Sequence, residues 1–109
     1  MHELGVALEL VDAIAERAGG ARVQRVVLEV GPLSSVLPDA LAFCFELATE
    51  GTSVHGASLE VRTSPARARC QSCRRELSLQ RASDRCPCGA YDLEWQSGDA
   101  LRILELEVA

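Results

Sequence analysis

Four cysteines in two close pairs constrain this chain more than any other feature. Two residues separate Cys70 from Cys73, and after a further twelve residues Cys86 and Cys88 follow with only Pro87 between them. In a reducing compartment such pairs are more often metal ligands than disulfides. Two short turns that each offer two thiolates can surround one tetrahedral Zn²⁺. The pattern therefore predicts a structural zinc site of the zinc-ribbon kind.

Two alternatives to a four-cysteine zinc site stay open at this point. The first is a redox dithiol, although residues 74–77 do not clearly open the helix that normally follows a reactive pair. The second uses only one of Cys86 and Cys88, because a single intervening residue requires a sharp turn, which Gly89 partly relieves. The fifth cysteine, Cys44, lies on the apolar stripe of a predicted helix and is expected to be a buried, inert thiol.

The charge of the cysteine segment differs from that of the whole chain. The 109 residues include 16 acidic residues and 11 arginines, which gives a net charge of −5. Residues 64–88, however, hold six arginines: Arg67, Arg69, Arg74, Arg75, Arg81 and Arg85. We interpret these arginines as compensation for the charge of a zinc–thiolate site. An acidic protein is a poor candidate for wrapping nucleic acid, so no nucleic-acid partner is expected.

The sequence contains no recognisable segment for crossing or entering a membrane. No stretch approaches the run of about 18 apolar residues that a membrane-spanning helix needs. The start of the chain lacks the basic stretch, apolar run and cleavage site of a secretory signal. We therefore predict a cytoplasmic protein without membrane contact.

Amphipathic periodicity predicts the elements on either side of the cysteine segment. Helical spacing predicts one helix over residues 3–18 and another from Pro38 to just before Gly51. The apolar stripes of the two helices are Leu4, Leu8, Val11, Ile14, Ala15 and Ala18, and Leu37, Leu41, Cys44, Phe45 and Ala48. Alternating apolar and polar residues predict strands over 22–30, 59–63 and 103–108.

These elements predict an α+β fold of two domains. Two helices pack on one face of a three-stranded sheet, and the last strand of that sheet follows the cysteine segment in the chain. The zinc-ribbon-like domain is therefore inserted rather than appended. Residues 1–63 plus 101–109 are expected to form the first domain, and residues 64–100 the inserted zinc-binding domain.

The opening tripeptide Met1-His2-Glu3 is a second candidate metal site. An α-amine, backbone amides and an imidazole from consecutive residues close small chelate rings, and planar coordination rich in nitrogen suits Ni(II) or Cu(II). A histidine at position 2 is nevertheless more often a solvated terminus than a ligand. His55 lies in a predicted loop and is a weaker candidate than His2.

Several motifs occur together and in order along the chain. They are Met1-His2-Glu3-Leu4, the segment Leu-Glu-Val-Gly-Pro-Leu-Ser at 28–34, Phe-Cys-Phe-Glu-Leu at 43–47 before Glu-Gly-Thr at 50–52, the cysteine pairs, and Ser-Gly-Asp-Ala-Leu-Arg-Ile at 97–103. In this combination the chain resembles the HypA/HybF family, the nickel-delivery accessory proteins of [NiFe] hydrogenase maturation. The resemblance spans essentially the whole chain.

The resemblance implies a nickel metallochaperone that is not an enzyme. It implies that Met1, His2 and Glu3 bind Ni(II), with His2 indispensable, and that Cys70, Cys73, Cys86 and Cys88 bind Zn(II). Nickel would pass, with a HypB-type GTPase, to the hydrogenase large subunit, and some members also supply urease. We expect a monomer or homodimer. The chain departs from the family at the second cysteine pair, where Cys-Pro-x-Cys-Gly is shortened to Cys86-Pro87-Cys88-Gly89.

Two other classes of function compete with this interpretation. One is a zinc-ribbon adaptor that uses its arginine face, including Arg74 and Arg75, to recruit a partner and carries no transferable metal. The other is a thiol redox enzyme, which would need an accessible cysteine of low pKa. The sequence shows neither a catalytic set nor a glycine-rich phosphate loop.

Overall fold

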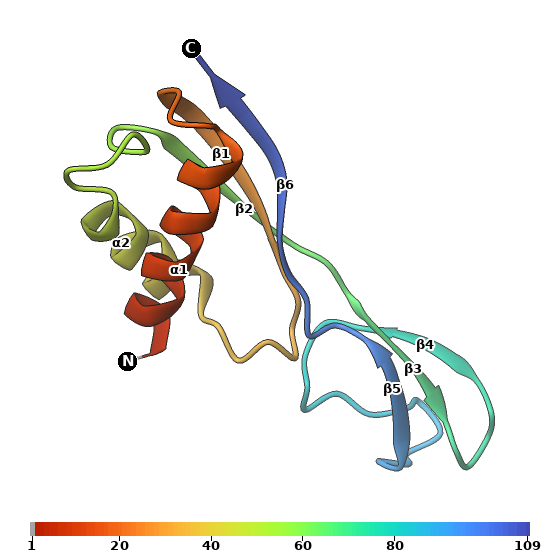
Figure 1. Ribbon diagram of the computed structural model, residues 1–109. Coiled ribbons are helices and arrows are strands. Elements are labelled where there is room, and N and C mark those ends of the chain that lie inside the picture. The colour runs from red at the N-terminus through yellow and green to blue at the C-terminus, as the bar shows by residue number, and fades with distance from the viewer. Residues whose placement is uncertain (1) are drawn as a thin grey trace. The chain divides into compact units, whose positions relative to one another are not determined.

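A computed structural model describes residues 2–109 and contains two helices and six strands over that range (Figure 1). In chain order they are α1 (His2–Arg17), β1 (Val23–Val30), α2 (Pro38–Ala48), β2 (Ser58–Thr63), β3 (Ala66–Cys70), β4 (Glu76–Leu79), β5 (Leu93–Ser97) and β6 (Leu101–Val108). The contacts divide the chain into two compact units. The first comprises residues up to 28, 36–62 and 102–109, and the second comprises 29–35 and 63–101.

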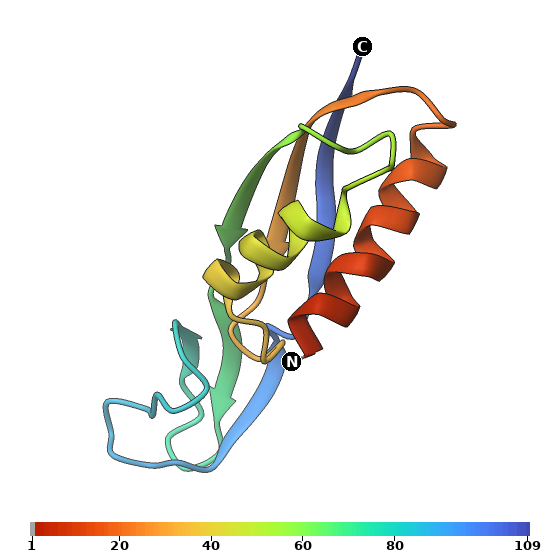
Figure 2. The same cartoon turned by 90° about the vertical axis from the view of Figure 1, so that its left-hand side faces the viewer.

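The first unit is the predicted α+β body. Its sheet has the strand order β2-β1-β6, with β1 and β2 running in the same direction and β6 in the opposite one (Figure 1). Both helices lie on the same side of this sheet and pack against each other (Figure 2). The predicted fold class, with two helices over a three-stranded sheet and a last strand that follows the cysteine segment, is confirmed.

The core of the first unit is built from aliphatic side chains of both helices and the central strand. Its fully buried members include Val11 and Ile14 of α1, Leu41 of α2, and Val26 and Leu28 of β1. Burying side chains of this kind contributes about 1.5–3 kcal/mol each before conformational entropy is subtracted. This unit therefore has the apolar core expected of a small domain.

The predicted helix stripes were partly wrong. Leu4 and Leu8 are exposed, and α1 instead buries Ala7 and Leu10 beside Val11 and Ile14. The first half of α1 is apolar on two adjacent faces, so periodicity alone could not select the one that meets the sheet.

Two further residues differ from the predicted pattern. Leu37 is exposed because it precedes α2 as its N-cap residue, in an extended conformation that does not follow helical spacing. Val27 was expected on the polar face but is fully buried, because β1 is the central strand and has a neighbour on each side. Cys44 is half-buried rather than buried.

The polar face of the first sheet carries an ion-pair network centred on Arg25. Its guanidinium donates to Glu60 at 2.8 Å, and to Glu105 and Glu107 at 3.2 and 2.9 Å. These acceptors lie on β2 and β6, on either side of β1, so one arginine links all three strands. Pairs this exposed contribute about 0–1 kcal/mol each.

The second unit contains a separate three-stranded antiparallel sheet, in the order β4-β3-β5. Along the central strand β3, Ala66, Ala68 and Cys70 are buried, whereas Arg67 and Arg69 are exposed. This alternation is that of a strand with one covered and one solvent-facing side. These three strands were not predicted from the sequence.

Residues 29–35 also belong to the second unit, although the sequence analysis assigned them to the first domain. The amide of Gly31 donates to Ala100 O at 2.9 Å, and the amide of Leu33 donates to Gly98 O at 2.7 Å. The domain boundaries at 63/64 and 100/101 stay a prediction.

Two glycines permit a close approach of three backbone segments in the second unit. A Cβ placed on Gly31 would lie 2.1 Å from Gly98 O, and one placed on Gly98 would lie 2.5 Å from the Ala66 Cβ. Gly98 also has a φ of 125°, which side chains rarely allow. Both glycines are part of the sequence motifs on which the family resemblance rests, and their role here is steric.

We expect Gly31→Ala to lower the free energy of unfolding by about 1–3 kcal/mol, because the added methyl group requires the backbone to shift. Gly5→Ala is the matched control. No heavy atom lies within 4 Å of its added Cβ, and it is expected to stabilise α1 by about 0.5–1 kcal/mol. Urea unfolding followed by circular dichroism and by Trp95 fluorescence measures both. Equal effects of the two substitutions would contradict this account.

Candidate metal sites

Each cysteine pair lies on a turn closed by backbone hydrogen bonds. In the first turn, the amide of Arg74 donates to Cys70 O at 2.8 Å, and that of Cys70 to Arg75 O at 2.9 Å. In the second, the amide of Gly89 donates to Cys86 O at 2.8 Å, and that of Cys86 to Ala90 O at 3.2 Å. The second turn thus repeats the hydrogen-bond pattern of the first with one residue fewer.

The residue after the second cysteine of each turn has a left-handed backbone. Arg74 has a φ of 63°, and Gly89 has a φ of 96°. Glycine adopts this conformation without steric cost, whereas a residue with a side chain is strained there by about 1–2 kcal/mol. The sequence analysis identified Gly89 as relief for the shortened pair but did not foresee the conformation of Arg74.

The four sulfur atoms converge on one point. All four Sγ atoms lie within 4.8 Å of one another. The Sγ atoms of Cys70 and Cys88 are 3.7 Å apart, and those of Cys73 and Cys86 are 3.5 Å apart. A tetrahedral site with Zn–S bonds of about 2.3 Å has S···S edges of about 3.8 Å. The cluster therefore fits a four-thiolate zinc site, and the shortened pair reaches it with both cysteines.

The electrostatics of the cluster favour a bound cation. Cys70 and Cys86 are buried, whereas Cys73 and Cys88 are exposed. The Cys73 amide, which donates to the Cys70 sulfur at 3.4 Å, lowers the pKa of Cys70 to about 7. The Cys88 amide lowers the pKa of Cys86 as well, but burial and the neighbouring thiols outweigh it and raise that pKa to about 12. Four thiolates at this spacing repel one another unless a cation neutralises them.

The redox alternative lacks the local structure that it needs. A reactive Cys-x-x-Cys pair normally precedes a helix, whose positive end stabilises the thiolate. Residues 76–79, which follow Cys73, form the strand β4. The first pair is thus arranged as a metal-binding turn.

Polar contacts that the sequence analysis missed support the first turn and the loop between the pairs. The hydroxyl of Ser72 donates to both carboxylate oxygens of Asp92, at 2.9 and 3.1 Å. The carboxylate of Asp84 accepts the amides of Gln80 and Arg81 at 3.1 and 3.0 Å. Such polar pairs leave no periodic pattern in a sequence, so no feature could have identified them.

The second candidate site lies at the start of α1. Helix α1 begins at His2, whose side chain is 54% exposed, and Met1 lies outside the described residues. The His2 Nε2 is 3.4 Å from a carboxylate oxygen of Glu3, whose side chain is only 12% exposed. The same oxygen accepts the amide of Leu37 at 3.4 Å. Of the predicted nickel ligands, the structure thus brings His2 and Glu3 together.

Hydrogen bonding and charge keep the Glu3 carboxylate ionised. The Leu37 amide contributes most to lowering the pKa of Glu3, followed by its own amide and, to a smaller extent, by His2. The first four amides of a helix have no acceptor within it, so a metal can use the His2 and Glu3 amides without breaking helical hydrogen bonds. His55 lies apart from this site, in the loop between α2 and β2, where its carbonyl accepts a bond from Arg22 at 3.3 Å.

Comparisons with known proteins agree with these features. The chain matches, over residues 1–108, a family described as "Hydrogenase/urease nickel incorporation, metallochaperone, hypA". The hydrogenase maturation factor HypA of Geobacter metallireducens is 45% identical over 109 residues, covering 99% of each chain. That of Nostoc punctiforme is 43% identical over 108 residues, covering 99% of this chain and 96% of the relative.

A solved structure has the same fold. The solution structure of the Ni metallochaperone HypA from Helicobacter pylori has a TM-score of 0.67 and 24% sequence identity to this chain, with coverage of 99% of this chain and 97% of that one. Within residues 2–109, neither helix combines the length and apolar character needed to cross a membrane.

We expect removal of metal by a strong chelator to unfold residues 66–96 while α1 and α2 persist. The second unit buries few large apolar side chains, and structural zinc contributes roughly 10–16 kcal/mol to the folding of comparable peptides. Amide hydrogen exchange and Trp95 fluorescence measure the loss. Unchanged protection of residues 66–96 in metal-free protein would contradict the assignment.

Substitution tests the individual ligands. We expect Cys70→Ser, Cys73→Ser, Cys86→Ser and Cys88→Ser each to lower zinc content, because each removes one of the four sulfurs. Cys44→Ser is the control and is expected to retain one zinc ion per chain. Metal analysis of the purified variants provides the measurement. Full zinc content in Cys86→Ser or Cys88→Ser would show that this cysteine is not a ligand.

Proposed function

The chain belongs to the HypA family of nickel-incorporation metallochaperones, and we propose that it binds Ni(II) at its N-terminus and delivers it for the maturation of [NiFe] hydrogenase. The observation that carries this proposal is the exposed imidazole of His2 at the first residue of α1, 3.4 Å from the ionised Glu3 carboxylate. Imidazole is a good ligand for nickel, and consecutive residues supply several donors at once.

The nickel ligands in this proposal are Met1, His2 and Glu3. The α-amine, the backbone amides and the imidazole provide nitrogen donors, and the Glu3 carboxylate adds negative charge beside them. The His2 side chain is 54% exposed, so an acceptor's ligands can approach the metal and replace the donors one at a time. Exchange of this kind is what delivery requires, and nickel is the cargo rather than a resident cofactor.

The zinc ion in this proposal is structural. The four coordination positions of a tetrahedral ion are all occupied by cysteines, namely Cys70, Cys73, Cys86 and Cys88. No coordination position is left open for a substrate. The protein is accordingly not an enzyme in this proposal. Zinc holds the second unit folded, while nickel is bound and released at the other site.

The partners follow from the family. We propose that the chain acts in the cytoplasm with a HypB-type GTPase, that the [NiFe] hydrogenase large subunit receives the nickel, and that urease accessory proteins are further candidates. The chain acts as a monomer or homodimer. Membranes and nucleic acids have no part in this function.

Nickel titration of zinc-loaded protein tests the proposal directly. We expect His2→Ala and an N-terminal extension of two residues each to weaken Ni(II) binding by about tenfold or more, since one removes the imidazole and the other converts the free amine to an amide. His55→Ala is the matched control, because it removes the other histidine of the chain. Isothermal titration calorimetry provides the affinities.

The outcome separates this function from the adaptor alternative. Stoichiometric nickel binding that survives both changes at the N-terminus would exclude the terminal site. A chain that binds no nickel, but still binds a partner through Arg74 and Arg75, would be a zinc-ribbon adaptor. Equal losses in His2→Ala and His55→Ala would point to non-specific histidine binding.

A further inference from the structure

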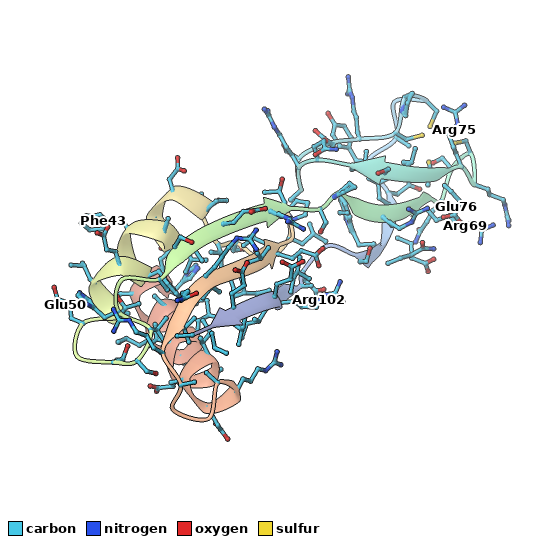
Figure 3. All side chains as sticks on the ribbon, turned by 90° about the horizontal axis from the view of Figure 1, so that it is seen from above. Phe43, Glu50, Arg69, Arg75, Glu76 and Arg102 are labelled. Atoms are coloured by element: carbon cyan, nitrogen blue, oxygen red, sulfur yellow. The ribbon has the colours of Figure 1, made fainter. Side chains whose placement is uncertain are left out.

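The outer face of α2 exposes large apolar side chains. Phe43 is 67% exposed and Leu47 is 51% exposed. Residues four apart lie on the same side of a helix, so these two side chains are neighbours. Figure 3 shows Phe43 and Glu50 on the side of α2 that faces away from the strands. An exposed aromatic residue beside an exposed leucine is an apolar patch without a partner inside the first unit.

Carboxylates flank this patch at both ends of the helix, with Asp39 in the first turn and Glu46 and Glu50 at the negatively charged C-terminal end. Asp39, Glu46 and Glu50 are exposed, and α2 contains no basic residue. The C-terminal end of a helix carries a partial negative charge, so Glu46 and Glu50 are unfavourably placed there. None of the three carboxylates forms an ion pair within residues 2–109. A cationic partner would relieve this repulsion.

A pocket of about 270 Å³ lies beside the patch. One wall of the pocket consists of Ala42 and Glu46 of α2 and its C-cap residue Thr49. The other wall consists of residues 55–57 and Leu59. The positions of the first wall lie about 100° around the helix from the row of residues 43, 47 and 50, because each is offset from that row by one residue. The pocket is smaller than the roughly 300–1,000 Å³ typical of small-molecule sites. Its size suits one anchoring side chain of a protein partner, as at interface hot spots.

These observations together define the chemistry of the missing partner. The surface combines the apolar patch, a pocket for one side chain and three carboxylates that have no ion pair in the described part of the chain. Nucleic acids and anionic membranes carry the same sign of charge as this surface and would be repelled. An amphipathic helix with basic flanks would bury the apolar patch and neutralise the carboxylates.

We propose that the outer face of α2 is a docking surface for a cationic amphipathic helix of a partner protein. One apolar side chain of that helix fills the pocket beside Glu46. Other apolar side chains cover Phe43 and Leu47, and its Lys or Arg residues pair with Asp39, Glu46 and Glu50. The surface is separate from the N-terminal nickel ligands, so it sets which protein binds rather than which metal.

A synthetic peptide is the probe for this surface. It is a helix of about 18 residues with leucines on one face and lysines on the other, a length of about five turns. Two matched peptides replace all lysines by glutamate or all leucines by serine. We expect the Leu/Lys peptide to bind zinc-loaded protein and to shift the NMR signals of α2 and residues 55–59. The two matched peptides are expected to bind at least about tenfold more weakly.

Matched variants separate this surface from general attraction to an acidic protein. Two double variants are each expected to bind the Leu/Lys peptide about tenfold more weakly. They are Glu46→Gln/Glu50→Gln and Phe43→Ser/Leu47→Ser. Glu9→Gln/Glu16→Gln removes the same charge from exposed positions of α1 and is expected to change binding less than about twofold. The glutamine variants keep the side-chain shape, so they test the proposal even if the serine variant is unstable.

Three results would overturn the proposal. The first is an equal loss of binding in the α1 and α2 glutamine variants, which would indicate non-specific attraction. The second is NMR shifts confined to residues outside α2 and 55–59. The third is concentration-dependent dimerisation of the chain alone that Phe43→Ser/Leu47→Ser abolishes, because the occupant of the surface would then be a second copy. None of these results concerns nickel binding. Failure of the proposed function would instead appear in a separate measurement of Ni(II) affinity at the N-terminus.

Discussion

Convergence of four sulfur atoms on one point is the constraint on which the second unit depends. Among residues 2–109, the ten largest fully buried side chains include eight aliphatic residues of the first unit, and the remaining two are Cys70 and Cys86. The first unit therefore has an ordinary apolar core, whereas the interior of the second is built around thiols. A piece of chain this small rarely buries enough apolar surface to fold alone. Four thiolates around one ion would supply the missing stabilisation and leave that ion no open position.

The N-terminal site has the opposite physical character. His2 is exposed at the end of a helix, and the nearby Glu3 carboxylate accepts the amide of Leu37 and lies 3.4 Å from the His2 imidazole. In the proposed function the exposed His2 leaves one side of this site open, so a metal bound there can be exchanged. A closed sulfur site and an open site rich in nitrogen also select different metals, because thiolates suit zinc while planar nitrogen donors suit Ni(II). In the proposed function, the two sites thus divide structural support and transport between them.

The sequence predicted those features that local chemistry determines, and it failed where tertiary contacts decide. Cysteine spacing predicted the cluster, because the two pairs recur within one short segment. Pro38 predicted the start of α2, because a helix start depends on neighbouring residues. The buried face of α1 was missed, since Leu4 and Leu8 satisfy helical periodicity as well as Ala7 and Leu10 do. The approach of Gly31 to Gly98 and the bond from Ser72 to Asp92 join distant residues and leave no periodic pattern. The resemblance suggested the family, which the comparisons confirm, while the nickel and zinc ligands stay predictions.

The central claim is that two metals occupy two sites of different donor chemistry. X-ray absorption at the zinc and nickel edges of one doubly loaded sample tests it most directly, because each edge reports the donors of its own metal. The account predicts four sulfur neighbours around zinc at about 2.3 Å, and only nitrogen or oxygen neighbours around nickel. Sulfur in the nickel shell, or a zinc shell with fewer than four sulfurs, would contradict it.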